Sequence, residues 1–279
     1  MAVLEPYKGS YYLWKFLPSQ VASIIFIVLF LAFTGLHFWR IYKFRSWFCL
    51  AFAVGCLCEV IGYTARAVAY NNTSSLPIYI IQACFLVIAP AFFAASIYMT
   101  LSRIIRCVKG EHLSIIRIKW LTKAFLIGDL LSLNVQGGAS GLTSSDNANT
   151  AKLGENIILA GLCIQLALLV FFFATAVIFQ VRLRRRPTRQ SLASDAPWLQ
   201  TLYMIYIASA LIFARSVFRV VEYVEGQDGY SLTHEWTLYV FDAAPMLVVT
   251  FIFWFWYPGH IQPPSESVES VELNSRSKV

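Results

Sequence analysis

Long apolar stretches recur along almost the whole chain, and they restrict its fold more than any other feature. Hydrophobic residues make up 58% of the sequence and charged residues only 13%, whereas an ordinary soluble domain has roughly 25% charged residues. A helix that spans a bilayer needs about 20 consecutive, mostly apolar residues. We identify such stretches at residues 17–39, 47–69, 77–104, 119–142, 155–181, 199–221 and 236–257. The sequence therefore predicts an all-α, polytopic membrane protein that forms one bundle of seven transmembrane helices.

Basic residues alternate between the loops and set the expected orientation of the bundle. They follow the first, third and fifth stretches, at Arg40, Lys43, Arg45, Arg103, Arg106, Lys109, Arg117, Lys119, Arg182, Arg184, Arg185, Arg186 and Arg189. The other loops hold almost no Lys or Arg, and the last one is acidic, with Glu222, Glu225, Asp228 and Glu235. Because positively charged loops stay in the cytoplasm, we expect the N-terminus outside and the C-terminus inside.

Three segments follow from this topology. Residues 1–16 are expected to be a short extracellular N-terminus, 17–257 the transmembrane domain, and 258–279 a disordered cytoplasmic tail rich in Pro, Ser and Glu. The N-terminus has no basic region followed by a short apolar core, so we expect no cleaved signal peptide. The loop after the second stretch carries two overlapping N-x-[ST] triplets that begin at Asn71 and Asn72, which are candidate N-glycosylation sites on the outer side.

Charge and residue usage exclude several classes of partner. The net charge of +7 comes from loops expected to face an anionic lipid leaflet, so we expect membrane lipids and no nucleic acid as partners. All six cysteines lie in apolar stretches or at cytoplasmic ends, which argues against a disulfide framework. The four histidines are dispersed and no phosphate-binding G-x-x-x-x-G-K-[ST] loop is present. We expect no metal, no cofactor and no enzymatic activity.

Charged residues inside the apolar stretches are the best guide to function. A charge at the middle of a bilayer costs about 2.5 to more than 10 kcal/mol, so it is retained where a partner, a cavity or a function compensates. Such charges occur within the stretches at Glu59, Asp129, Arg215, Arg219 and Asp242. Each of them therefore needs a partner or a role.

Helical spacing and the predicted orientation place these charges in the outer half of the membrane. Glu59 and Arg66 are seven residues apart and share a helix face. Arg215, Arg219 and Glu222 form one stripe at i, i+4 and i+7. We therefore predict a polar pocket that binds substrate and is lined by Glu59, Arg66, Gln82, Asp129, Gln136, Asn156, Arg215, Arg219, Glu222 and Asp242. The alternative is that the charges form interhelical ion pairs that only hold the bundle together.

Several distinctive segments occur in order along the chain. They are Glu59-Val60-Ile61-Gly62-Tyr63-Thr64-Ala65-Arg66, Ala89-Pro90-Ala91-Phe92-Phe93-Ala94-Ala95-Ser96-Ile97-Tyr98, Asp129 with Gln136-Gly137-Gly138, Gly154-Glu155-Asn156-Ile157-Ile158, Arg215-Ser216-Val217-Phe218-Arg219-Val220-Val221-Glu222-Tyr223 and Tyr239-Val240-Phe241-Asp242-Ala243-Ala244-Pro245-Met246. Together they resemble the fungal lipid-translocating exporter family. That family includes a sphingoid long-chain-base transporter and proteins that confer resistance to aminosterols and other toxic amphiphiles. The resemblance implies seven helices, a fungal membrane and a lipid-like substrate.

The expected function is the translocation or efflux of lipid-like amphiphiles, in the plasma membrane. Carboxylates such as Glu59 and Asp242 would receive the ammonium group of a sphingoid base, and the arginines would keep them ionised or bind a phosphate head group. The alternative is a seven-helix lipid or stress sensor that does not transport. The last stretch has neither an N-P-x-x-Y motif nor a lysine for a retinal Schiff base, so its likeness to known heptahelical receptors is one of topology only.

Overall fold

The computed structural model describes residues 14, 16–143, 148–188, 190–191, 198–226 and 229–260. Within these ranges the secondary structure is helical, without strands. The long helices are α1 (Gln20–Phe44), α2 (Leu50–Ala69), α3 (Leu76–Cys107), α4 (Ile118–Thr143), α5 (Ala148–Arg185), α7 (Trp198–Glu225) and α10 (Ala244–Phe255). The short ones are η1 (Trp47–Cys49), η2 (Glu111–Leu113), α8 (Tyr230–Thr233), α9 (Glu235–Leu238), η3 (Tyr239–Ala243) and η4 (Pro258–His260).

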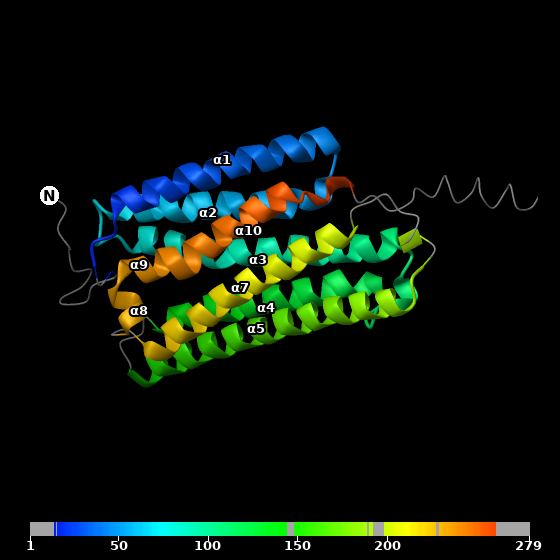
Figure 1. The fold of residues 1–279 in the computed structure, drawn as a ribbon. Helices are drawn as coiled ribbons and strands as arrows, with labels where there is room; N and C mark the ends of the chain where they lie inside the picture. Colours follow the sequence, from blue (N-terminus) through cyan, green and yellow to red (C-terminus); the bar gives the residue numbers. More distant parts are fainter. Residues whose placement is uncertain are drawn as a thin grey trace, which may run out of the picture.

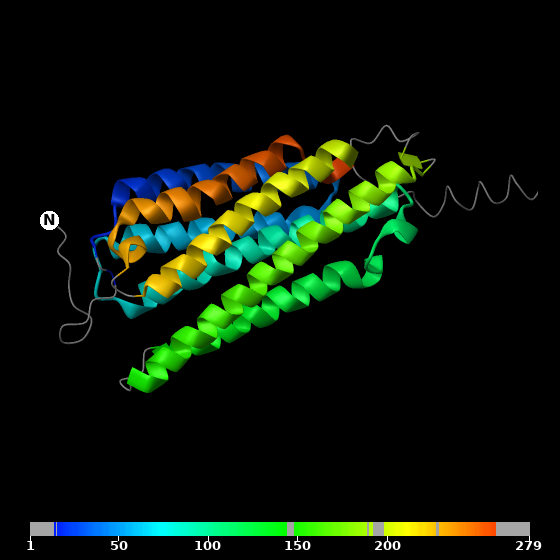
Figure 2. The same ribbon diagram turned by 60° about the horizontal axis from the view of Figure 1, so that its bottom comes forward.

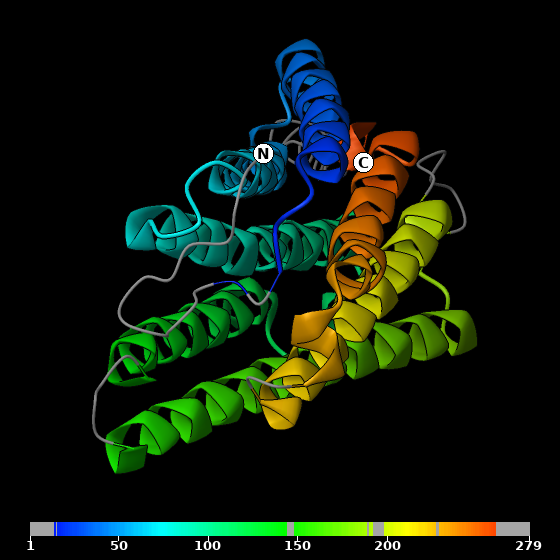
Figure 3. The same cartoon turned by 90° about the vertical axis from the view of Figure 1, so that its left-hand side faces the viewer.

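The long helices run side by side as an elongated bundle (Figure 1). Viewed along the bundle, α3 lies in the middle and packs against α2, α4 and α7 (Figure 3). Helices α4 and α5 form a pair along one side, which is clearest in Figure 2. Helices α1 and α10 pack against each other, and α10 also contacts α7. The segments on either side of α3, namely α2 and the α7–α10 pair, are those that carry most of the intramembrane charges.

The contact between α2 and α3 depends on glycine. A Cβ atom on Gly62 would lie 2.7 Å from a methyl carbon of Leu86, and one on Gly55 would lie 2.8 Å from the ring of Phe93. Since real Cβ contacts are longer than this, the two helix backbones approach each other as closely as they do only because these positions lack side chains. The buried ring of Phe52 fills the space beside them, with its centroid 4.6 Å from that of Phe93.

Six helical segments in the described part of the chain are long and apolar enough to cross a membrane: Gln20–Phe44, Trp47–Ala69, Leu76–Cys107, Lys152–Arg185, Trp198–Glu225 and Glu235–Phe255. They coincide with six of the seven predicted stretches. Helix α4 occupies the remaining one but is less apolar, because Asp129, Asn134 and Gln136 interrupt it and Lys119 and Lys123 lie in its first turns. Large apolar side chains on α1 face outward, as expected where the surrounding solvent is hydrocarbon. The chain is an integral membrane protein.

The two ends of the bundle differ in charge. The C-terminal ends of α1, α3, α5 and α10 and the N-terminal ends of α2, α4 and α7 lie at one end (Figure 1), where the basic residues gather. Among the described residues, Glu111 is the only acidic side chain at this basic end. The opposite, acidic end carries Glu155, Glu222, Glu225 and Glu235. The predicted extracellular N-terminus and disordered tail lie almost entirely outside the described residues.

Candidate functional site

A network of buried ion pairs joins α7 to η3. The Arg215 Nε atom lies 2.5 Å from Asp242 Oδ1, in an ion pair without hydrogen-bond alignment. Arg219 Nη2 donates a hydrogen bond to Asp242 Oδ2 over 2.7 Å, and Arg219 Nη1 donates one to Glu222 Oε2 over 3.0 Å. Asp242 is 2% exposed. One carboxylate thus neutralises parts of two guanidinium groups inside the bundle, and Glu222 completes the charge balance.

Helix α7 presents its charges to this network because of their spacing. Arg215, Arg219 and Glu222 lie on one face of the helix, as predicted from the sequence. Arg215 also donates from Nη2 to the backbone carbonyl of Leu86 on α3 over 2.6 Å. That carbonyl lies four residues before Pro90, and a proline has no N–H to satisfy it. Pro90 therefore leaves the carbonyl oxygen of Leu86 free to accept the hydrogen bond from Arg215.

A π-helical turn positions Asp242. The segment η3 is a π-helix, and the Ala244 N–H donates to the carbonyl of Tyr239, five residues earlier. Pro245 follows immediately and cannot donate to the carbonyl of Phe241. In place of a regular α-helical turn, the structure has a π-turn directly before this proline. Such turns insert an extra residue into a helix and are frequent at functional sites.

Glu59 on α2 lies beside the network without joining it. It is 1% exposed, and its Oε1 atom has no hydrogen-bond partner among the described residues. The carboxyl group interacts electrostatically with Arg215, Asp242 and Arg219. One turn further along α2, the buried hydroxyl of Tyr63 also has no hydrogen-bond partner within the described part. Glu59 is therefore a buried carboxyl group with an unused acceptor next to two arginines.

Arg66 belongs to a second cluster, nearer the acidic end. Its Nη2 atom lies 2.8 Å from Glu235 Oε1, and its Nε donates to the Tyr239 hydroxyl over 3.2 Å. Glu235 Oε1 also accepts the backbone N–H of Ser19 at 2.7 Å. This cluster ties the start of α1 to α2 and α9. The sequence pattern predicts Glu235 in a loop and assigns no site role to Glu235 or Tyr239, but the structure places both in helical turns, and their i, i+4 spacing is the signal that could have found them.

Two predicted residues lie in another seam, between α3, α4 and α5. Asp129 Oδ2 accepts a hydrogen bond from the Tyr98 hydroxyl over 2.9 Å, and Asp129 Oδ1 is buried without a partner in the described ranges. Gln136 Nε2 donates to Ser132 Oγ over 3.0 Å and to Gln165 Oε1 over 3.4 Å. The hydrogen bonds of Asp129 with Tyr98 and of Gln136 with Gln165 join neighbouring helices, whereas that between Gln136 and Ser132 lies within α4.

The predicted pocket residues therefore divide into groups. Glu59, Arg215, Arg219, Glu222 and Asp242 come together. Arg66 pairs with Glu235, and Asp129 and Gln136 lie in the α3–α4–α5 seam. Gln82 on α3 is buried with Oε1 unpartnered among the described residues, whereas Asn156 on α5 is exposed.

The part of the chain that the structure describes contains neither a cluster of metal ligands nor a disulfide bond. No group of three or more His, Cys, Asp or Glu side chains there is placed to hold a metal ion. The cysteines at 49, 56, 58, 84, 107 and 163 are all free thiols. The chemistry that the site offers is that of buried carboxylates and guanidinium groups.

Comparison with known proteins gives a consistent set of relatives. A family model described as "RTA1 like protein" matches residues 52–265. Protein RTM1 of Saccharomyces cerevisiae is 39% identical over 199 residues, which are 71% of this chain and 63% of the relative. Protoporphyrin uptake protein 1 of the same organism is 36% identical over 204 residues, covering 73% and 66% of the two chains. Both alignments span slightly less than two thirds of the relative's length.

A third relative is more distant but is aligned over more of its length. The sphingoid long-chain base transporter RSB1 of S. cerevisiae is 27% identical over 277 residues, covering 87% of this chain and 72% of the relative. No solved structure matches the chain.

Proposed function

This chain belongs to the RTA1-like protein family, and on that premise we propose that it moves an amphiphilic, lipid-like molecule across a membrane. The resemblance to fungal lipid-translocating exporters is confirmed by the family match and by the relative named as a sphingoid long-chain base transporter. Another relative is named for protoporphyrin uptake. Sphingoid bases and porphyrins are both amphiphiles, with an apolar body and ionisable groups.

The observation that carries the proposal is the free acceptor of Glu59 beside the Arg215–Asp242–Arg219 network. Asp242 already receives two arginines, and Asp129 receives the Tyr98 hydroxyl. Glu59 Oε1 has no such partner among the described residues. Because a buried carboxylate without a partner is costly, Glu59 is suited to exchange a proton for the ammonium group of a substrate. The apolar body of the substrate would lie along the apolar helix faces.

The same site accommodates an anionic head group in a different way. Arg215 and Arg219 supply guanidinium groups that bind carboxylate or phosphate oxygens. A protonated Glu59 would then donate a hydrogen bond instead of repelling the substrate. The network therefore suits amphiphiles with a head group of either charge.

Reconstituted protein tests this function directly. Liposomes containing the purified chain are expected to move a fluorescent sphingoid base between leaflets faster than protein-free liposomes, with protoporphyrin as the anionic comparison and a labelled diacylglycerol as the uncharged control. A lack of acceleration for both charged probes would contradict transport. Ligand-dependent signalling without flux would favour the sensor alternative.

For the topology, we propose that α4 crosses the membrane as well, so that seven helices span the plasma membrane with the N-terminus outside. The basic and acidic ends of the bundle support this orientation through the positive-inside rule. In a background without native cysteines, Asn72→Cys is expected to react with a membrane-impermeant maleimide on intact cells. Glu111→Cys is expected to react only after permeabilisation. Both positions are exposed, and the reverse labelling pattern would overturn the orientation.

The same orientation exposes Asn71 and Asn72 to glycosylation, which a mobility shift on deglycosylation would show.

A further inference from the structure

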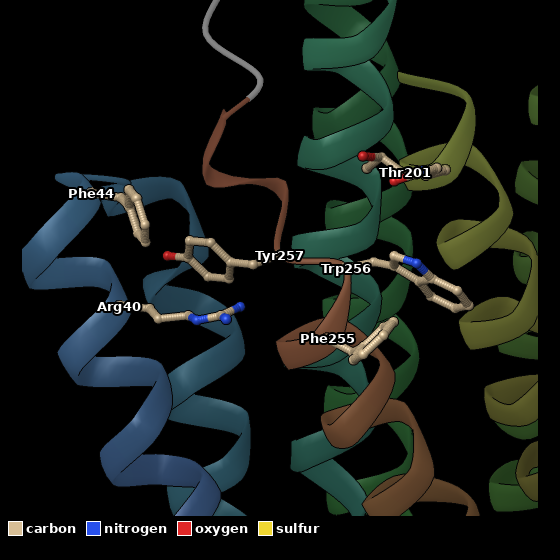
Figure 4. Close-up of a pocket in the computed structure, with 7 residues that line it drawn as sticks. Arg40, Phe44, Thr201, Phe255, Trp256 and Tyr257 are labelled. Carbon is tan, nitrogen blue, oxygen red and sulfur yellow. The ribbon is translucent and has the colours of Figure 1, made fainter. Parts of the chain in front are cut away.

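A cavity of about 190 Å³ lies at the basic end of the bundle, far from the charged network. It is lined by Arg40 and Phe44 of α1, Gln200 and Thr201 of α7, and Phe255, Trp256 and Tyr257 at the end of α10 (Figure 4). The close-up shows the Arg40 side chain pointing from α1 toward the end of α10. The cavity is thus bounded by three helices at the basic end of the bundle.

Arg40 is held in place by aromatic rings but retains unused donors. Its Cζ atom lies 4.8 Å from the ring centroid of Trp254 and 5.3 Å from that of Tyr257. Nη1 donates to the backbone carbonyl of Trp254. Within the described ranges, Nε and Nη2 make no hydrogen bond to protein, and the side chain is partly exposed. A fixed guanidinium group with free donors is suited to bind a phosphate through two hydrogen bonds.

The surroundings of the cavity favour an anion. Among the described residues, no acidic side chain lines it. Besides Arg40, its lining includes the amide of Gln200, the hydroxyls of Thr201 and Tyr257 and the indole of Trp256, all of which are groups of the kind that donate hydrogen bonds. A second cavity at the same end is lined by Tyr42, Lys43, Arg45 and Trp47. Two cavities at this end therefore combine cations with aromatic rings, and among the described residues neither is lined by an acidic side chain.

We propose that the Arg40 cavity binds the phosphate of an anionic phospholipid head group, and that this lipid bridges α1 and α7. The position of the cavity, at the basic end of a bundle of membrane-spanning helices, favours a lipid as the source of the phosphate. Exposed aromatic residues around it, such as Trp39 and Phe255, are typical of a membrane interface, where the acyl chains of a bound lipid lie beside apolar helix faces. The site is separate from the charged network, so it does not depend on the proposed transport.

Binding is tested with the full-length protein in a neutral detergent. Short-chain phosphatidylserine and phosphatidylinositol are titrated against the protein, with short-chain phosphatidylcholine and inorganic phosphate as comparisons, and binding is followed by native mass spectrometry. Saturable binding of the anionic lipids is expected. Arg40→Gln is expected to weaken it by about tenfold or more, the size expected for loss of a charge-assisted hydrogen bond.

Two further variants test whether lipid binding depends on the cavity itself, and not on the general positive charge of this end or on a change of fold. Gln200 is exposed, so Gln200→Glu adds a repelling charge to the cavity without disturbing packing and is expected to weaken binding to a similar degree. Arg106 is exposed at the same end but outside both cavities, and Arg106→Gln is expected to have little effect. Equal weakening by Arg106→Gln would show unspecific attraction and overturn the site. Inorganic phosphate that binds as tightly as the lipids would overturn the assignment to a lipid.

Discussion

Asp242→Ala is expected to lower the free energy of unfolding by roughly 3–5 kcal/mol, the usual cost of removing one partner from a buried ion pair. Asp242 contacts Arg215 at 2.5 Å and Arg219 at 2.7 Å, so its loss leaves two guanidinium groups short of a counter-charge. Glu222 is the remaining carboxylate of the network and contacts only Arg219 among the described residues. The effect is measured as a lower melting temperature in detergent and a smaller monodisperse fraction on size exclusion.

The control for this prediction is Glu155→Ala, which removes an exposed carboxylate at the acidic end. Exposed charges contribute little to stability, so its melting temperature is expected to stay close to that of the unchanged protein. Asp242→Asn separates charge from shape, because the asparagine retains an acceptor oxygen but not the negative charge. If Asp242→Ala and Glu155→Ala melt at the same temperature, the buried ion pairs do not form as described.

The long helices could be predicted from the sequence because their signal is local. Apolar length alone placed stretches at 17–39 and 155–181, and the structure has helices at Gln20–Phe44 and Ala148–Arg185. The differences at the ends have a physical reason. An apolar stretch ends, by definition, at the first charged residues. The helix itself continues through Arg182 and Arg184, because backbone hydrogen bonding does not depend on the side chain and their charged ends can reach water.

The pairing of charges could be predicted only in part. The stripe of Arg215, Arg219 and Glu222 follows from helical spacing within one element. The partner of Arg66 does not, because it depends on how the segment between α7 and α10 folds back and brings Glu235 to the C-terminal end of α2. The hydrogen bond from Tyr98 to Asp129 depends in the same way on the rotation of α3 against α4.

The π-turn at Asp242 is a feature that the sequence of this helix alone could not predict. A proline in a helix predicts a disturbance, but a kink and a π-turn are both compatible with the lack of an N–H at Pro245. The choice depends on contacts with another helix, and here Arg215 and Arg219 both reach Asp242. A rule that reads one helix at a time cannot include that contact.

Glu59→Gln is expected to reduce transport of a sphingoid base about a hundredfold while leaving the fold intact. Glutamine has nearly the same shape as glutamate, and Glu59 Oε1 has no hydrogen bond to lose within the described ranges, so the packing between α2 and α3 is retained. What disappears is the negative charge that would receive the ammonium group. A hundredfold fall corresponds to roughly 2.7 kcal/mol at about 1.36 kcal/mol per tenfold, which is within the range for a charge-assisted hydrogen bond. Flux into liposomes and the melting temperature are measured on the same preparation.

Comparison with other carboxylates decides whether Glu59 is the group that meets the substrate. Glu155→Gln removes an exposed carboxylate at the acidic end and is expected to leave flux unchanged, because that charge lies outside the network. Asp129→Asn alters a second buried carboxylate outside the α7–η3 network, whose Oδ1 atom has no hydrogen-bond partner in the described ranges. If Asp129→Asn stops the flux and Glu59→Gln does not, the head group passes through the α3–α4–α5 seam. Asp129, Ser132 and Gln136 would then line its path, and the α7–η3 ion pairs would act only to hold the helices together.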